Sequence, residues 1–201
     1  MKVLSPFGPK IAQLKLNKSL INKINKEVDR ISSSKKLAKK YDYSKKLVGQ
    51  VKQEIQLPKN FIKKYLAKKI NQSIQEFIRL TTGKTTKTVK IKNFWVVSQF
   101  SHEYNPVHYH DGHVSGVGYL KIPKFTTNQK SLATNGTNDF INGNRMFLNN
   151  RIFNHNPRVG DIILFPNYLM HTAYPFTNNG ERRSFSFNAE VDNNIANVFS
   201  K

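Results

Sequence analysis

Histidines gathered in two places of this sequence could hold a metal ion. His108, His110 and His113 stand within one run of six residues, and His171 follows 61 residues after His110. Fe(II) in oxygenases is held on one face by two imidazoles and usually one carboxylate, which leaves positions open for a co-substrate and O₂. Residues i and i+2 of a strand point the same way, so His108 and His110 can reach one metal, and His171 can close the face from a partner strand.

A basic and hydroxylic motif follows the last of these histidines. Arg182 comes 11 residues after His171, and Arg183 and Ser184 come next. An arginine in this place can pair bidentately with the distal carboxylate of a dicarboxylic co-substrate, and the Ser184 hydroxyl can add a hydrogen bond. Taken alone, the segment equally suits an ordinary turn that enters a strand.

Strands must position these side chains, and the second half of the chain is rich in β-prone segments. A turn with Gly160 and Asp161 leads into an apolar run that ends shortly before His171, which would deliver His171 to the mouth of a barrel. Strict alternation over 184–188 suits a strand with one wet face. The expected strands are residues 89–97, 114–122, 151–153, 161–165 and 183–191. Residues 126–150, rich in Asn, Gly and Thr, are expected to form a long loop or hairpin insertion.

The first half has the spacing of helices. Apolar residues form one stripe over 18–34, and a second amphipathic stripe runs from Pro58, which suits a first helical turn, to about Leu80. Gly83 stands where a C-cap is expected. Helices followed by a β-rich half predict an α+β fold or a helix-buttressed barrel. We divide the chain into 1–84, a basic helical part packing on the barrel, and 85–201, the β core, within one continuous domain.

Charge is distributed unevenly between the two parts. Residues 1–90 hold 23 Lys and Arg against 5 Asp and Glu, a net charge of +18, whereas residues 91–201 carry +3. A basic part can attract nucleic acid, but nearly all its cations are Lys, and bidentate phosphate recognition favours Arg. The sequence has no cysteine and no apolar run long enough to span a membrane, so we expect a soluble, cytoplasmic protein without disulfides or thiolate metal sites.

The stretch from Trp95 to Asn188 resembles the 2-oxoglutarate/Fe(II)-dependent oxygenases of the prolyl 4-hydroxylase-like type, in a lysine-rich version typical of phages and marine bacteria. The resemblance covers about half the chain. The matching pieces include His171 and the segments 105–110, 115–123, 160–166 and 182–188.

This resemblance implies a double-stranded β-helix (jelly-roll, cupin-like) barrel that uses Fe(II), 2-oxoglutarate and O₂. It assigns His108 and His171 to the metal. It assigns Arg182 to the C5 carboxylate of 2-oxoglutarate, with Ser184 beside it and Tyr119 as a further residue facing that carboxylate. No catalytic residue beyond the metal ligands is implied. Trp95 and Phe165 are candidate pocket walls, although a place in the core as ordinary aromatic side chains is the favoured interpretation.

One departure from the family pattern concerns the second ligand. The usual pattern is His-x-Asp, but the residue two after His108 is His110, and Asp111 follows it directly. Two interpretations stay open. Strand alternation favours His110 as the ligand, whereas the usual preference for a carboxylate favours Asp111, swung inward by a bulge.

The predicted function is therefore hydroxylation of an unidentified substrate, a peptidyl side chain first, with release of succinate and CO₂. Two alternatives belong to other classes. A cupin-type metalloenzyme would use the same histidines without 2-oxoglutarate, and a non-catalytic basic barrel would bind nucleic acid or other anions.

Overall fold

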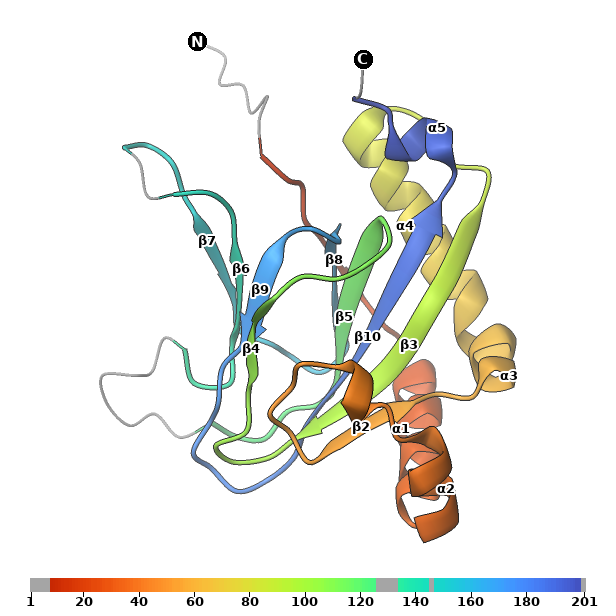
Figure 1. Cartoon of the computed structure of the whole chain (residues 1–201), viewed down its shortest axis with the longest axis vertical. Helices are drawn as coiled ribbons and strands as arrows, with labels where there is room; N and C mark the ends of the chain where they lie inside the picture. The colour runs from red at the N-terminus through yellow and green to blue at the C-terminus, as the bar shows by residue number, and fades with distance from the viewer. Residues whose placement is uncertain (1–7, 126–133, 145–146, 200–201) are drawn as a thin grey trace.

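Two antiparallel sheets that face each other form the body of the molecule (Figure 1). The computed structural model describes residues 8–125, 134–144 and 147–199. The six-stranded sheet has the order β1 (Ala12–Lys15), β8 (Asp161–Pro166), β5 (Val114–Lys121), β10 (Arg182–Val191), β3 (Val89–Gln99) and β2 (Gln53–Gln56). The four-stranded sheet has the order β4 (Asn105–His108), β9 (Met170–Ala173), β6 (Asn138–Ile141) and β7 (Ile152–His155).

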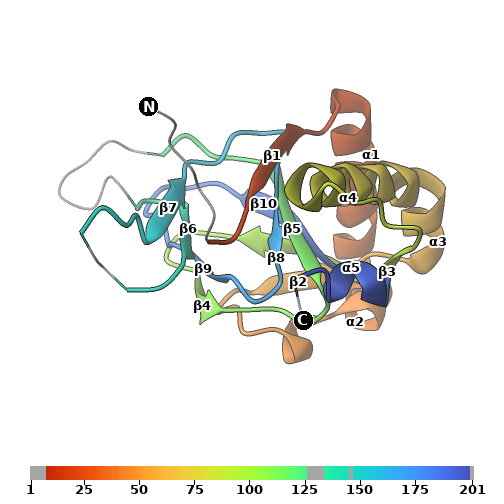
Figure 2. The ribbon, with the colours of Figure 1, turned by 90° about the horizontal axis from the view of Figure 1, so that it is seen from above.

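Helices cover the face of the larger sheet that lies away from the smaller sheet (Figure 2). The two longest are α1 (Lys18–Ser32) and α4 (Ala67–Thr82). The shorter ones are α2 (Lys35–Tyr41), α3 (Lys59–Phe61), η2 (Ile62–Leu66) and α5 (Asn193–Ala196). The short helix η1 (Ser44–Lys46) lies instead on the side of the smaller sheet, where Lys46 lines a cavity between the two sheets. No helix in the described ranges is both long and apolar enough to cross a membrane.

The expected helices are confirmed, and their ends follow from local chemistry. The Asn17 side chain accepts a hydrogen bond from the backbone N–H of Leu20 at 2.8 Å, which satisfies one free donor at the start of α1. Pro58 immediately precedes α3. Gly83 ends α4 with a φ of +71°, a left-handed conformation that residues with a Cβ rarely adopt.

The helices are held to the sheet by an apolar core. Stripes of buried side chains on α1 and α4 pack against Phe94, Phe185 and Phe187 of the larger sheet. The ring of Phe94 stacks on Phe185 at 5.2 Å and on Phe187 at 6.0 Å between centroids. The Phe185 ring lies so close over Gly118 that a Cβ there would clash with it. Each buried aromatic side chain contributes about 1.5–3 kcal/mol to folding.

Alternation along β10 gives the larger sheet an apolar outer face and a polar inner face. Phe185 and Phe187 belong to the core beneath the helices. Arg182, Ser184 and Ser186 line a cavity on the opposite side. The strict alternation expected for 184–188 is therefore confirmed, and it aims the polar side chains of β10 at the smaller sheet.

The structure also holds strands that the sequence did not predict. β1 pairs with β8 and β2 pairs with β3, so the helical N-terminal part contributes two strands to the larger sheet. β6, by contrast, lies within residues 126–150 and pairs with β7, so the hairpin that was one of the two forms expected there is present; residues 126–133 and 145–146 lie outside the described residues. Within the described residues the two sheets stay separate ladders, so the expectation of a barrel needs one correction: the sheets face each other without closing.

Candidate metal and co-substrate site

A cavity of about 310 Å³ lies between the two sheets, within the size range of small-molecule sites. The larger sheet contributes Arg182 and Ser184 to its walls, and the smaller sheet contributes His108 and His171. The site residues expected from the two separate motifs therefore face one cavity, although 74 positions of sequence separate His108 from Arg182.

The three predicted histidines meet in this cavity. His108 on β4 is paired directly with His171 on β9, and His110 follows just after the end of β4. The ligand atoms of the three imidazoles all lie within 4.8 Å of one another. The pairing of β4 with β9 thus brings two distant histidines to the same level of the smaller sheet, as expected for His108 on one strand and His171 on a partner strand.

Hydrogen bonds fix the tautomer of each ring. His108 Nδ1 lies 2.7 Å from the Pro106 carbonyl oxygen, and His171 Nδ1 lies 2.9 Å from the Leu169 carbonyl oxygen. A carbonyl oxygen only accepts, so both Nδ1 atoms carry the proton and both Nε2 atoms keep a lone pair.

The third ring is held in the same tautomer through a hydroxyl group. His110 Nδ1 lies 3.1 Å from Ser115 Oγ, which donates its own proton to Asn188 Oδ1 at 2.9 Å. The hydroxyl therefore accepts from His110 Nδ1, and His110 Nε2 also presents a lone pair. Such orientation of ligand imidazoles by neighbouring groups is typical of metal sites.

The spacing of these lone pairs suits a cation. His108 Nε2 and His110 Nε2 lie 3.1 Å apart, close to the roughly 3 Å expected for two nitrogens bound at right angles to one metal. Burial lowers the pKa of all three rings, and for His110, burial together with the neighbouring His108 lowers the pKa to about 3. Three neutral imidazoles with converging lone pairs fit a divalent metal such as Fe(II).

Asp111 takes a different position from the histidines. It contributes to the cavity wall, but its side chain is exposed, and the metal-binding group found among the described residues consists of His108, His110 and His171 alone. The geometry is thus the one expected if His110 is the second ligand.

Among the described residues, no carboxylate forms an ion pair with the buried cation of Arg182. It is 2% exposed, and its three hydrogen bonds run to the Gly136 carbonyl at 3.2 Å, Gln99 Oε1 at 3.0 Å and Asn138 Oδ1 at 2.5 Å. All three acceptors are neutral. Guanidinium has five N–H donors, so each terminal nitrogen keeps one N–H for a further acceptor. Burial lowers the pKa of Arg182, yet an arginine stays charged, and a carboxylate would offset this charge.

Tyr119 and Ser184 flank this cation in different ways. The Tyr119 ring lies under the guanidinium, 5.2 Å from its central carbon, and the hydroxyl donates to Asn138 Oδ1 at 2.8 Å. Burial raises the pKa of the Tyr119 hydroxyl, which is therefore a neutral donor. Ser184 pairs with Tyr119 across the sheet and lines the cavity.

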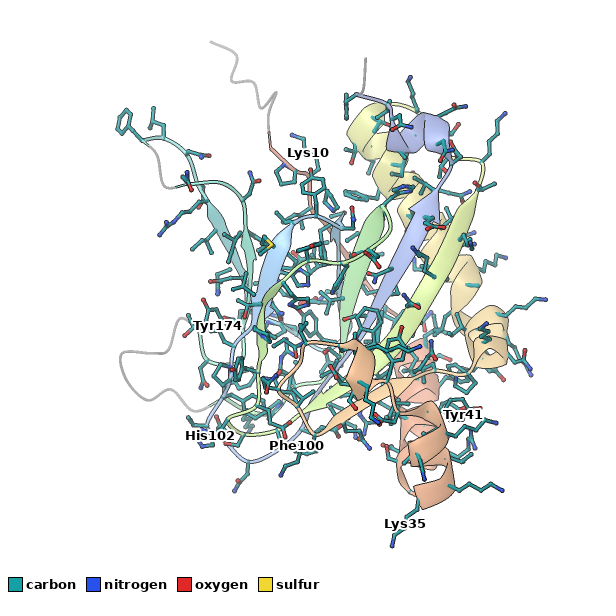
Figure 3. All side chains as sticks on the ribbon, viewed as in Figure 1. Lys10, Lys35, Tyr41, Phe100, His102 and Tyr174 are labelled. Atoms are coloured by element: carbon teal, nitrogen blue, oxygen red, sulfur yellow. The ribbon has the colours of Figure 1, made fainter. Side chains whose placement is uncertain are left out.

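Sequence reasoning missed the residues that hold Arg182 in place. Gln99 ends β3, and its amide donates to the Tyr174 carbonyl at 3.0 Å, which orients its oxygen toward Arg182. Asn138 starts β6, inside the segment expected to form a long loop or a hairpin insertion. Tyr174, labelled in Figure 3, directly follows Ala173, the β9 residue that pairs with Asn138, so Gln99 and Asn138 both lie next to Tyr174. No local signal marks either residue, since both act through contacts far apart in sequence.

Aromatic side chains support the histidines. Trp95 lines the cavity and meets the His110 ring edge-on, with 5.5 Å between centroids. Phe165 is fully buried behind the site and packs against His171 at 4.8 Å. Of the two candidate pocket walls, Trp95 therefore faces the cavity and Phe165 belongs to the core.

Comparison with known families agrees with this geometry. Residues 93–188 match the family described as "Putative 2OG-Fe(II) oxygenase". The matched segment spans both metal-binding segments and the Arg182 motif, as the resemblance seen in the sequence predicted. No curated protein matches the chain.

Three solved structures share this fold at low sequence identity. A prolyl hydroxylase from Trichoplax adhaerens, in complex with a hypoxia inducible factor peptide fragment, has a TM-score of 0.60 at 12% identity, over 95% of this chain and 87% of that one. The viral collagen prolyl hydroxylase of Paramecium Bursaria Chlorella virus-1, a 2OG complex, has a TM-score of 0.57 at 14% identity, over 89% and 94%. HygX from Streptomyces hygroscopicus, with nickel, 2-oxoglutarate and hygromycin B bound, has a TM-score of 0.57 at 11% identity, over 90% and 82%.

These findings confirm the predicted fold class, an α+β chain of the double-stranded β-helix type with helices on one outer face. They also confirm the predicted family resemblance, the enzyme class, and Fe(II) and 2-oxoglutarate as metal and co-substrate. A nucleic-acid partner finds no support in them, and a phage origin and a cytoplasmic location stay predictions.

Proposed function

We infer that this chain, whose residues 93–188 carry the match to the 2OG-Fe(II) oxygenases, works as one of them, and we propose that it hydroxylates a peptidyl side chain with release of succinate and CO₂. One observation carries the proposal. Three neutral imidazole lone pairs and a buried, unpaired Arg182 cation line a single cavity, and this donor set fits one divalent metal and one carboxylate-bearing co-substrate.

The residues divide the work of binding. His108, His110 and His171 would hold Fe(II) through Nε2, each ring oriented by the acceptor at its Nδ1. Arg182 would bind the C5 carboxylate of 2-oxoglutarate through one N–H on each terminal nitrogen, with the Ser184 hydroxyl beside it. When bound, Fe(II) supplies the activation of O₂ that couples decarboxylation of 2-oxoglutarate to oxidation of a substrate C–H bond.

The protein positions and shields these groups. Phe165 and Phe140 pack against His171 and keep water from that side of the ring. Gln99 and Asn138 hold the guanidinium so that its free N–H groups are fixed before the co-substrate arrives. Groups organised in advance lose little freedom on binding, which favours a defined orientation of the co-substrate.

A peptide substrate is supported by the shape of the cavity and by one neighbour. Val48 and Tyr109 line the cavity and are also 48% and 65% exposed, so the mouth is bounded by apolar side chains that a peptide could cover. The Trichoplax adhaerens enzyme of the same fold was solved with a peptide fragment bound.

The proposal is tested by Fe(II)-dependent conversion of 2-oxoglutarate to succinate, followed by mass spectrometry of a peptide library for the gain of one oxygen atom.

Paired variants His110→Ala and Asp111→Ala assign the second ligand: we expect loss of succinate formation in the first and its retention in the second. The cupin-type alternative predicts that the protein turns over a substrate without 2-oxoglutarate. It also predicts that the Arg182→Gln variant keeps this activity. Succinate formation that does not depend on Fe(II), or library peptides that never gain oxygen, would contradict the proposal.

A further inference from the structure

Glu54 is a buried carboxyl group in the cavity that the proposed chemistry does not use. It lies on β2, is 2% exposed, and lines the cavity. Its Oε2 atom is buried without a hydrogen-bond partner in the described part of the chain. Buried polar atoms are nearly always paired, so an exception in a cavity indicates a partner that arrives from outside.

A second unpaired acceptor lies beside it. Asn105 Oδ1, on β4 of the smaller sheet, is also buried without a hydrogen-bond partner among the described residues. A Cβ built on Gly49 would lie 2.5 Å from Asn105 Oδ1 and 2.6 Å from Glu54 Oε1. Both acceptors therefore flank the same point, and a residue larger than glycine at position 49 would crowd them.

No residue in the described part of the chain supplies a counter-ion for Glu54. Burial is the main cause that raises the pKa of Glu54 to about 7, and the negative charge of Asp42 adds to it. Lys46 also contributes to the cavity wall, but its ammonium lies over the Tyr43 ring, 5.3 Å from the centroid. The negative form of Glu54 is therefore unbalanced in the empty protein.

The distances of these two acceptors from the proposed metal and 2-oxoglutarate sites suit a substrate that is held at one end and oxidised at another position. Glu54 pairs with Val97, and Val97 pairs with Ser184, so two strand spacings, about 10 Å, separate Glu54 from the proposed 2-oxoglutarate site. Asn105 precedes the metal ligand His108 by three residues of the same strand, again about 10 Å. A substrate held here would place a carbon several bonds away near the metal.

We propose that Glu54 and Asn105 form a substrate-recognition subsite that binds a cationic N–H donor group, a guanidinium or an ammonium. The proposal rests on the proposed function and narrows its substrate to one with a basic group. Guanidinium and ammonium groups carry only donors and a positive charge, so they satisfy both oxygens and balance the carboxylate. A neutral amide would bring an acceptor as well and leave the charge of Glu54 unbalanced.

Calorimetric titration of the full chain with matched probes tests the subsite. The peptide probes are acetyl-Ala-Arg-Ala-amide, acetyl-Ala-Lys-Ala-amide and the neutral citrulline analogue of the first, and agmatine serves as a free amine. We expect at least one cationic probe to bind at least about tenfold more tightly than the citrulline peptide. Preference for the peptides over agmatine would identify a basic side chain in a peptide, and the reverse would identify a free basic amine.

Variants connect the preference to Glu54. Glu54→Gln keeps the size of the side chain and is expected to abolish the preference for cationic probes, while Glu54→Asp keeps the charge and retains part of it. Glu76→Gln removes an exposed carboxylate on α4 and serves as the matched control that leaves the preference intact. Equal binding of the citrulline peptide, no binding of any cationic probe, or a preference that survives in Glu54→Gln would overturn the proposal.

The titrations are run with and without added Mn(II) and 2-oxoglutarate, beside the succinate assay on the wild-type chain. A charge preference in a chain that forms no succinate would leave the subsite standing and refute the oxygenase. Succinate formation without any charge preference would refute the subsite alone.

Discussion

Two neighbouring arginines on β10 show the difference between the two faces of the larger sheet. Arg183 points outward and binds Glu181 at 2.6 Å and Asp29 at 2.7 Å, so its charge is balanced within the protein. Arg182 points inward and has only neutral partners. Both are almost fully buried, so exposure does not distinguish them. What distinguishes a structural arginine from a binding arginine is the presence of an internal counter-ion.

The same contrast extends to the other polar groups. The cavity-facing groups, which are the three Nε2 lone pairs, Arg182 and Glu54, lack partners within the described structure that balance them. Removing a cavity-facing group should therefore impair the binding of a ligand with little loss of stability. Removing an outward-facing group should lower the stability of the fold with little effect on ligand binding.

The largest effect is expected from loss of a metal ligand. His171→Ala removes one of three converging lone pairs, and we expect Fe(II) affinity to fall at least about 100-fold. The free energy of unfolding should stay near the wild-type value, measured without metal. His102→Ala, in the loop after β3, is the control expected to keep metal affinity. Retained Fe(II) affinity in His171→Ala would contradict the assignment of the cavity-facing groups to ligand binding.

The outward arginine should show the opposite behaviour. Arg183→Gln removes the buried cation that Glu181 and Asp29 share with Lys121, and we expect a loss of about 1–3 kcal/mol in the free energy of unfolding. Urea denaturation checks this, with the exposed Arg30→Gln, whose effect should be much smaller, as its control. A variant as stable as the wild type would show that the ion pairs of Arg183 do not hold the fold.

The raised pKa of Glu54 leads us to expect that the stability of the fold depends on pH. A carboxyl pKa raised by folding, here from 4.5 to about 7, destabilises the folded state once the unfolded carboxyl ionises. This cost is absent below about pH 4.5 and complete above about pH 7. We expect Glu54→Gln to be more stable than the wild type by about 1–3 kcal/mol at pH 8 and similar to it at pH 4. Denaturation curves with the same pH slope for both proteins would contradict this.

The smallest effect is expected from Tyr119. Its hydroxyl donates to Asn138 Oδ1, which also accepts from Arg182, so Tyr119→Phe removes a contact that acts only through Asn138. We expect the KM for 2-oxoglutarate to rise about two- to tenfold, with kcat nearly unchanged. An unchanged KM would mean that Gln99 and Gly136 suffice to hold the guanidinium.

The sequence was informative where function depends on residues in short motifs. The runs around His108 and Arg182, together with the strand that leads to His171, indicated the family and the helical and β halves. It was uninformative where position depends on pairing between distant segments. β2 and β6 are four-residue strands with polar residues, and such strands form because neighbouring strands pair with them rather than by their own propensity. Glu54 and Asn138 lie on these two strands, so neither could be assigned to the cavity.

The most direct test of the central claim compares the two arginines in one measurement. 2-Oxoglutarate is titrated anaerobically into the Fe(II)-loaded chain and into its Arg182→Gln and Arg183→Gln variants, at a temperature where all three are folded. We predict that Arg182→Gln weakens 2-oxoglutarate binding at least about 100-fold, since it removes a bidentate charged donor, and that Arg183→Gln binds like the wild type. Equal affinities for all three proteins, or a loss confined to Arg183→Gln, would contradict it.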